Sequence, residues 1–227
     1  NEKTPNKYSV KNYSLDHANN VSVREYTPNK ILSDKQNRHI EADVLYVTGH
    51  PWHKKGNVQD EIIYIPDWII NWLREKFLAN AEYKNVSEKI YIDRSDSLFS
   101  HCQIINSDEV WEFLKNEGFT KIRSTEITFK NQIGLFNSAS TIVGAHGAGL
   151  TNMIFSKSNT NIIEFAPENH PNNFFQRVSQ INNLNYRKIV SKNLRLNNHN
   201  KKGDILVDLK ILKEYFENLK EIKNNTI

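Results

Sequence analysis

The sequence predicts an α/β fold of Rossmann-like type, in which a parallel sheet carries helices on both faces. Two observations lead to this prediction. From Lys89 onward, short β-rich segments and amphipathic segments alternate at short intervals, which is the pattern of a doubly wound sheet. Within that region, the β-branched run 141–143 leads directly into a glycine-rich turn, 144–149, and apolar residues with helical spacing follow the turn.

The region before Lys89 is expected to be a separate piece of the chain. Residues 1–20 are polar and read as a lead-in loop, whereas 21–26 and 44–48 have the composition of short strands. Pro66 and Asp67 begin a helix that is expected to run to about residue 81. The expected apolar stripe of this helix consists of Trp68, Ile69, Trp72, Leu73 and Phe77. We therefore divide the chain into 1–80, a lead-in with a partial N-terminal α/β region, and 81–227, a Rossmann-like domain.

Strands and helices of the second region follow from periodicity and from cap residues. Strands are expected at 89–92, 120–126, 141–143, 161–165 and 185–190, with a short extended piece at 205–207. Helices are expected at 106–117, 129–138, from about 150, at 174–183 and at 209–220. Ser107 is the expected cap of the first of these helices, and Gly118 closes it. Residues 193–203 form an Asn-rich loop.

Composition narrows the function class. The chain has 227 residues, and its net charge of +4 is too mild to indicate nucleic-acid binding but is compatible with an anionic small molecule. Cys102 is the only cysteine, which excludes an intrachain disulfide or a Cys-based zinc site and favours a reducing, cytoplasmic location. No apolar run approaches the roughly 18 residues of a membrane helix. Because the chain starts at Asn1 without a methionine, we expect it to be a piece of a longer protein.

The glycine-rich turn is the first candidate site. A strand that ends in small residues before a helix leaves backbone N–H groups facing outward, and such a place suits an anion. His146 lies inside the turn, where it could donate to a phosphate or protonate a leaving group. The alternative is a tight turn that needs glycine only for its shape.

Two further charged residues follow predicted strands. Arg94 could clamp a diphosphate, or it could form a salt bridge with Asp93 or Asp96. Glu164 could accept hydrogen bonds from ribose hydroxyls. Alternatively, it could face solvent or cap a helix. We expect no metal site, because the carboxylates around Arg94 do not form the compact aspartate pair of a metal-dependent sugar-nucleotide enzyme.

Several nucleotide and hydrolase motifs are missing. The turn lacks the third glycine of G-x-G-x-x-G and lies late in the chain, so a nicotinamide oxidoreductase stays only as a rival interpretation. Neither a G-x-x-x-x-G-K-[ST] phosphate loop nor a G-x-S-x-G nucleophile elbow is present. Kinases, P-loop NTPases and serine hydrolases are therefore excluded.

Residues 142–155, IVGAHGAGLTNMIF, closely resemble the hallmark of glycosyltransferase family 61. Other motifs of the family are matched in the same order by Ile90-Tyr91-Ile92-Asp93-Arg94, Ile105-Asn106 with Glu109, Gly118-Phe119, Thr128-Phe129 with Gln132, and Ile163-Glu164. The resemblance covers about residues 89–186 well and continues more loosely on both sides. At 101–103 the chain has His-Cys-Gln, where family members often carry arginines.

The resemblance implies a GT-B enzyme that is inverting, needs no metal or other cofactor, and uses a nucleotide-sugar donor, which we expect to be a UDP-sugar. This chain would supply the C-terminal, nucleotide-binding half with a remnant of the N-terminal half, while the catalytic base belongs to the missing half. By position, the catalytic candidates are His146 and Arg94. The donor-binding candidates are Arg94, Ser95, Gln132, Gly144, His146, Gly147, Ala148, Gly149, Asn152 and Glu164.

The function predicted from the sequence is sugar transfer to a saccharide hydroxyl in polysaccharide or glycan biosynthesis. The partners would be the nucleotide sugar and the saccharide acceptor, without nucleic acid, and with peripheral association at the inner face of the membrane as an open option. The alternative is a non-catalytic nucleotide- or glycan-binding module, one half of a split or truncated enzyme.

Overall fold

The computed structural model describes residues 65–84, 87–95, 102–168, 170, 173–191 and 203–224. All of them belong to one compact unit, Trp52–Ile227. The strands expected at 21–26 and 44–48, and nearly all of the loop 193–203, lie outside the described residues.

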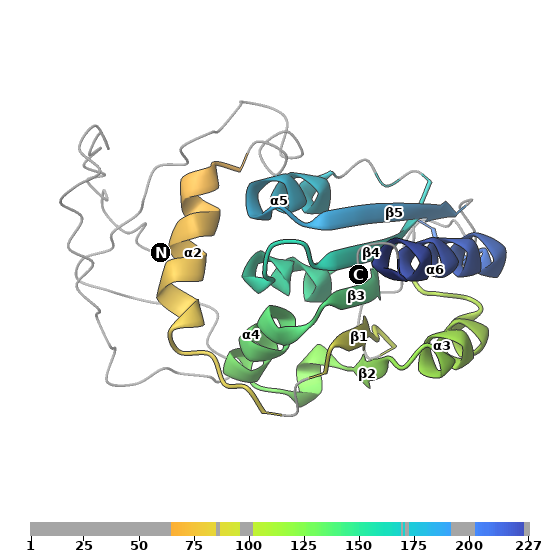
Figure 1. The fold of residues 1–227 in the computed structure, drawn as a ribbon, viewed down its shortest axis with the longest axis horizontal. Coiled ribbons are helices and arrows are strands. Elements are labelled where there is room, and N and C mark those ends of the chain that lie inside the picture. The colour runs from red at the N-terminus through yellow and green to blue at the C-terminus, as the bar shows by residue number, and fades with distance from the viewer. Residues whose placement is uncertain are drawn as a thin grey trace, which may run out of the picture. The chain divides into compact units, whose positions relative to one another are not determined.

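Five parallel strands form a single sheet (Figure 1). The strands are β1 (Lys89–Ile92), β2 (Thr120–Ile122), β3 (Thr141–Ala145), β4 (Asn161–Pro167) and β5 (Asn185–Ser191). Their order across the sheet is β2-β1-β3-β4-β5. The predicted parallel α/β sheet is confirmed. The strand expected at 120–126 ends early, because the chain turns into a short 3₁₀ helix, η1 (Ser124–Glu126).

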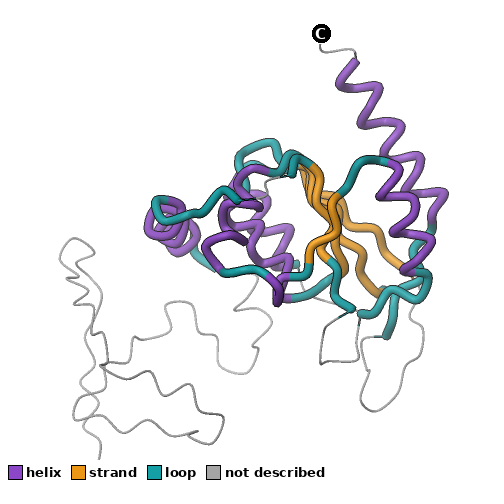
Figure 2. The backbone as a smooth tube through the Cα atoms, turned by 90° about the horizontal axis from the view of Figure 1, so that it is seen from below, coloured by secondary structure: helices purple, strands orange, loops and turns teal. Residues whose placement is uncertain are grey.

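Helices cover both faces of the sheet, as the edge-on view shows (Figure 2). One face carries α2 (Asp67–Leu78), α4 (Phe129–Ser138), α5 (Phe174–Asn182) and the 3₁₀ helix η2 (Ala148–Phe155). The other face carries α3 (Ser107–Asn116) and α6 (Leu209–Asn224). Side chains alternate along each strand, so Ile90 and Ile92 enter the first core while Tyr91 enters the second.

Helix α2 packs on the sheet domain with a different face from the one predicted. Ile70 is completely buried, and Leu73 and Phe77 pack against the same core. Trp68 and Trp72 were expected inward, but they are 57% and 43% exposed, so that part of the predicted stripe is wrong. The physical reason is a rotation of the helix by about one residue, which places the smaller aliphatic side chains against α4, α5 and η2.

Two segments about a hundred residues apart meet at the beginning of α3. The backbone at 102–105 pairs with 203–205, through Cys102 N to Gly203 O (2.9 Å) and Ile205 N to Gln103 O (2.8 Å). Asn106, rather than the expected Ser107, precedes the helix, and its amide binds the backbone of Val207 twice. The side chain of Asn106 therefore fixes the start of α3 to the chain before α6.

Replacing Asn106 with alanine is expected to lower the free energy of unfolding by about 2 kcal/mol, because it leaves both polar backbone groups of Val207 without their partners. Val207 is 3% exposed, so water does not readily replace the lost bonds. Urea unfolding followed by circular dichroism measures the change. Asn116→Ala, at the exposed end of the same helix, is the matched control and should stay within about 0.5 kcal/mol of the wild type. Equal effects of the two variants would contradict the role of Asn106.

Candidate functional site

The strand order defines where a ligand is expected. After β1 the chain leaves towards α3 on one face, and after β3 it leaves towards η2 on the other face. The two strands are neighbours in the sheet, so a crevice opens between their carboxyl ends. In open α/β sheets, ligands bind at such a switch point, beyond the carboxyl ends of the strands.

A small pocket with a cavity volume of about 60 Å³ lies at this point. Residues 91–95 of β1 and the loop after it form one wall, and Ala145 of β3 also lines the pocket. A second wall consists of residues 102–104 with Ser107, the segment that is tied to 203–207. Two of the predicted donor-binding residues, Arg94 and Ser95, line this pocket.

Arg94 bridges the two strands of the switch point. Its guanidinium donates to the backbone oxygen of His146, just beyond β3, and lies directly over Gly147. A Cβ atom at residue 147 would lie within 2.6 Å of three guanidinium atoms. The backbone of Gly147 is extended (φ 160°, ψ 172°), so its glycine is explained by the room that Arg94 occupies and not by an unusual backbone angle.

The carboxylate of Asp93 binds Ser95 and Arg123. It accepts from the backbone N (3.0 Å) and hydroxyl (2.9 Å) of Ser95 and from Arg123 Nε (3.0 Å). Burial by itself raises the pKa of Asp93, but the bonds from Ser95 and Arg123 together hold this pKa below its ordinary value. Asp96, the other carboxylate considered for Arg94, lies outside the described residues.

His146 belongs to a buried polar chain on the α5 side of the sheet. Its Nδ1 contacts Glu164 Oε1, and the hydroxyl of Tyr186 donates to Glu164 Oε2. Glu164 is completely buried, whereas the His146 side chain is 10% exposed. The imidazole packs against His170 and Phe175, with ring centroids 3.6 Å and 5.1 Å apart. Burial, followed by the charge of Glu164, raises the pKa of Tyr186 above its ordinary value.

Comparison with known proteins identifies the family. Residues 25–163 match the family model described as Glycosyltransferase 61. The chain belongs to glycosyltransferase family 61. A beta-1,2-xylosyltransferase from Arabidopsis thaliana is 28% identical to this family 61 chain over 143 residues. The alignment covers 54% of this chain but 27% of that protein, so the chain spans about a quarter of the length of the relative it matches. The family predicted from the sequence motifs is confirmed.

Four other donor-binding candidates make packing contacts or hydrogen bonds within the fold. Gly144 is part of β3, and a Cβ there would lie 3.3 Å from Ile92 Cβ. A Cβ at residue 149 would lie 3.1 Å from Cγ2 of the same side chain. Asn152 donates to Gln132 Oε1 (2.7 Å), and Gln132 donates to Ser124 O (2.8 Å), which joins η2 to α4 and η1. These four candidates are not among the residues that line the switch-point pocket.

The hallmark turn also differs from its predicted geometry. The sequence suggests an α-helix from about residue 150, but Ala148–Phe155 forms the 3₁₀ helix η2. Leu150, Met153 and Ile154 point into the core as expected from their spacing. Ala148 is exposed at the start of η2. Residues 147–149 are all small, which lets the chain pass close to β1. The 3₁₀ helix, which is tighter than an α-helix, therefore follows from packing against Ile92.

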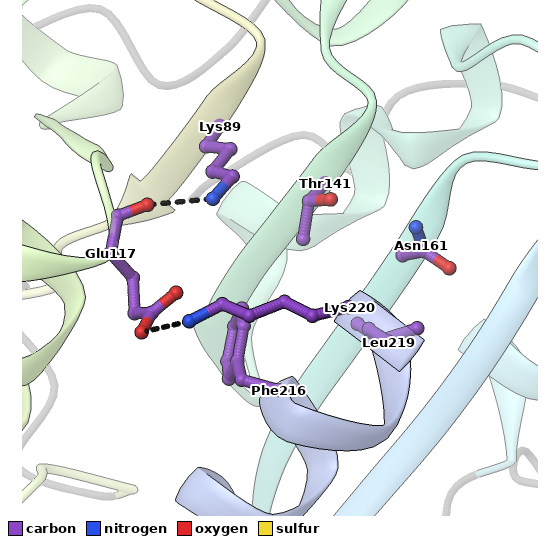
Figure 3. A pocket seen from close by; sticks show the side chains of 7 residues that line it. All are labelled: Lys89, Glu117, Thr141, Asn161, Phe216, Leu219 and Lys220. Carbon is purple, nitrogen blue, oxygen red and sulfur yellow. Dashed lines mark hydrogen bonds and ion pairs between the residues drawn. The ribbon is translucent and has the colours of Figure 1, made fainter. Parts of the chain in front are cut away.

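A second pocket of this family 61 chain lies at the opposite end of the strands (Figure 3). Lys89 Nζ donates to Glu117 O (2.7 Å), and Lys220 Nζ pairs with the Glu117 carboxylate (2.8 Å), which ties α6 to the end of α3. Thr141 and Asn161 begin β3 and β4, so the pocket borders the amino ends of the strands. Ligands of parallel sheets bind at the carboxyl ends, so the pocket beside Arg94 is the stronger candidate site.

Two further results concern metals and membranes. Among the described residues, no three His, Cys, Asp or Glu side chains gather into a group that could hold a metal ion. None of the helices in the described part of the chain combines the length and apolar composition that crossing a membrane requires.

Proposed function

We propose that this family 61 chain binds the diphosphate of a nucleotide sugar at the switch point and takes part in transfer of the sugar to a saccharide hydroxyl. The observation that carries the proposal is the position of Arg94, which joins the carboxyl ends of β1 and β3 beside the pocket. A guanidinium matches two phosphate oxygens at once and stays charged at any physiological pH. The relative from Arabidopsis supports the reaction class, because its name is that of a sugar transferase.

The chemistry requires stabilisation of the leaving group. When the glycosidic bond of the donor breaks, negative charge develops on the diphosphate, and fixed positive groups lower the energy of that state. In the proposal, Arg94 supplies the charge without a metal, and Gly147 leaves room for it. The acceptor hydroxyl attacks from the other side of the sugar, with inversion, and its catalytic base comes from the other half of a GT-B enzyme.

Titration calorimetry with UDP and with uridine tests donor binding. UDP is expected to bind at least about tenfold more tightly, because only UDP offers charged phosphate oxygens to the guanidinium. Adding EDTA is expected to leave the UDP affinity unchanged. Equal affinities for UDP and uridine would contradict the diphosphate site, and loss of UDP binding in EDTA would contradict metal-independent binding.

A second candidate is a nucleotide- or glycan-binding module without catalysis. Release of UDP from UDP-xylose in the presence of saccharide acceptors separates the two candidates. Turnover by the chain alone supports the transferase. Tight binding of UDP without turnover supports the binding module.

A further inference from the structure

We propose that Glu164 and Tyr186 are positioning residues that keep a proton on Nδ1 of His146, so that Nε2 is the ring nitrogen presented to the donor diphosphate. The proposal rests on the proposed function, because it assigns the second phosphate-binding group of the same site. It changes the role expected for Glu164 from contact with a ribose to orientation of a histidine.

The strand register brings the three side chains together. Gly144 of β3 pairs with Glu164 of β4, and His146 follows Gly144 by two residues, so both side chains lie on the same face of the sheet. Tyr186 precedes Lys188, the register partner of Glu164, by two residues and lies on that face as well. Three neighbouring strands thus contribute one group each to a continuous chain of hydrogen bonds.

The burial of Glu164 indicates that its carboxylate serves more than stability. Glu164 is 0% exposed, and the nearest core residues on this face, Ile142, Ile162 and Phe175, are apolar. A buried charge is costly, and replacing a buried polar network with apolar side chains often stabilises a protein. Stability alone therefore does not account for a glutamate at this position. One of its oxygens contacts His146 and the other accepts from Tyr186, and the complete burial of the side chain keeps both away from a ribose hydroxyl.

In the proposal, the contact with Glu164 sets the tautomer of the imidazole. A carboxylate oxygen can only accept from Nδ1, so the proton of a neutral ring is held on that nitrogen. No described residue hydrogen-bonds Nε2 of His146. The packing of the ring against His170 and Phe175 limits its rotation. Nε2 is thus the remaining polar atom of the His146 side chain. The imidazole is not among the residues that line the pocket, but the backbone oxygen of His146 binds Arg94, which lines it. In the proposal, a ring that carries both protons donates from Nε2 to a phosphate oxygen.

Nitrogen-15 NMR of the histidines tests the tautomer without any ligand. The chain has eight histidines, and the signal that His146→Ala removes identifies the ring. The expected result is a proton on Nδ1, alone or together with one on Nε2. A neutral ring protonated on Nε2 only would overturn the proposal, whether or not the chain binds UDP.

A double-mutant cycle tests whether Glu164 acts through His146. Glu164→Gln, which keeps the shape of the side chain, is expected to weaken UDP binding about tenfold in the wild type and less than twofold in the His146→Ala background. Equal losses in both backgrounds would overturn the proposal. If the Glu164→Gln variant does not fold, Tyr186→Phe replaces it in the same cycle. Its expected loss of UDP affinity is smaller, about threefold. If the wild type does not bind UDP, the proposed function is wrong. The NMR measurement of the His146 tautomer still decides the role of Glu164 in that case.

Discussion

Replacing Gly147 with alanine is expected to weaken UDP binding about 10- to 100-fold, as much as replacing Arg94 itself. The new Cβ would lie within 2.6 Å of three guanidinium atoms, so the arginine must leave its place over the turn. The fold should be preserved, because the backbone of residue 147 is extended and the atoms that must move belong to the end of a flexible side chain. Calorimetry with UDP measures the loss, and thermal unfolding checks the fold.

The arginine and the glycine are expected to act as one unit. If Gly147→Ala works only by displacing the guanidinium, then adding it to Arg94→Ala should cost no further affinity. Arg177→Ala is the matched control, since this arginine on α5 pairs with Asp67 of α2 instead. Its UDP affinity should equal that of the wild type. Additive losses in the double variant would show that Gly147 serves another purpose.

Replacing Gly134 with alanine is expected to lower the free energy of unfolding by about 3 kcal/mol. Gly134 lies in the middle of α4, where the backbone of Glu82 crosses the helix, and a Cβ would lie 2.7 Å from the Glu82 carbonyl carbon and closer still to its oxygen. Neither backbone can easily withdraw, because Glu82 N donates to Lys130 O of the same helix (3.0 Å). The clash outweighs the roughly 1 kcal/mol that alanine gains over glycine in a helix.

Thermal and urea unfolding measure this effect. Lys130→Ala, an exposed substitution one turn earlier in α4, is the control and should change stability by less than about 0.5 kcal/mol. A Gly134→Ala protein as stable as the control would show that the crossing of Glu82 over α4 is not tightly packed.

The parts of the fold with local signals were predictable from the sequence. Helix α4 spans the predicted residues 129–138, because Thr128 caps it through Asn131 N and the apolar spacing is regular. The parallel sheet follows from the alternation of strands and helices. In contrast, the rotation of α2 that exposes Trp68 and Trp72 was not predictable, because several apolar stripes on that helix have similar spacing and only the shape of the core selects between them.

The candidate site was predictable only in part. The position of Arg94 after a buried strand indicated an anion site, and the structure brings it to the switch-point pocket. The sequence carried no comparable signal for Tyr186, which reaches Glu164 from a different strand. Nor could it show that Asn106 binds Val207, since the two residues are 101 positions apart and neither bond has a local pattern.

The long separation in sequence between Asn106 and Val207 has a consequence for protein synthesis. Residues 102–107, which form one wall of the pocket, leave the ribosome about a hundred residues before 203–207, to which they are tied. The nascent sheet can assemble earlier, but this wall lacks its partner until the segment before α6 has emerged. A ribosome-bound chain from which 203–207 have not yet emerged therefore lacks the contacts that hold this wall of the pocket in place.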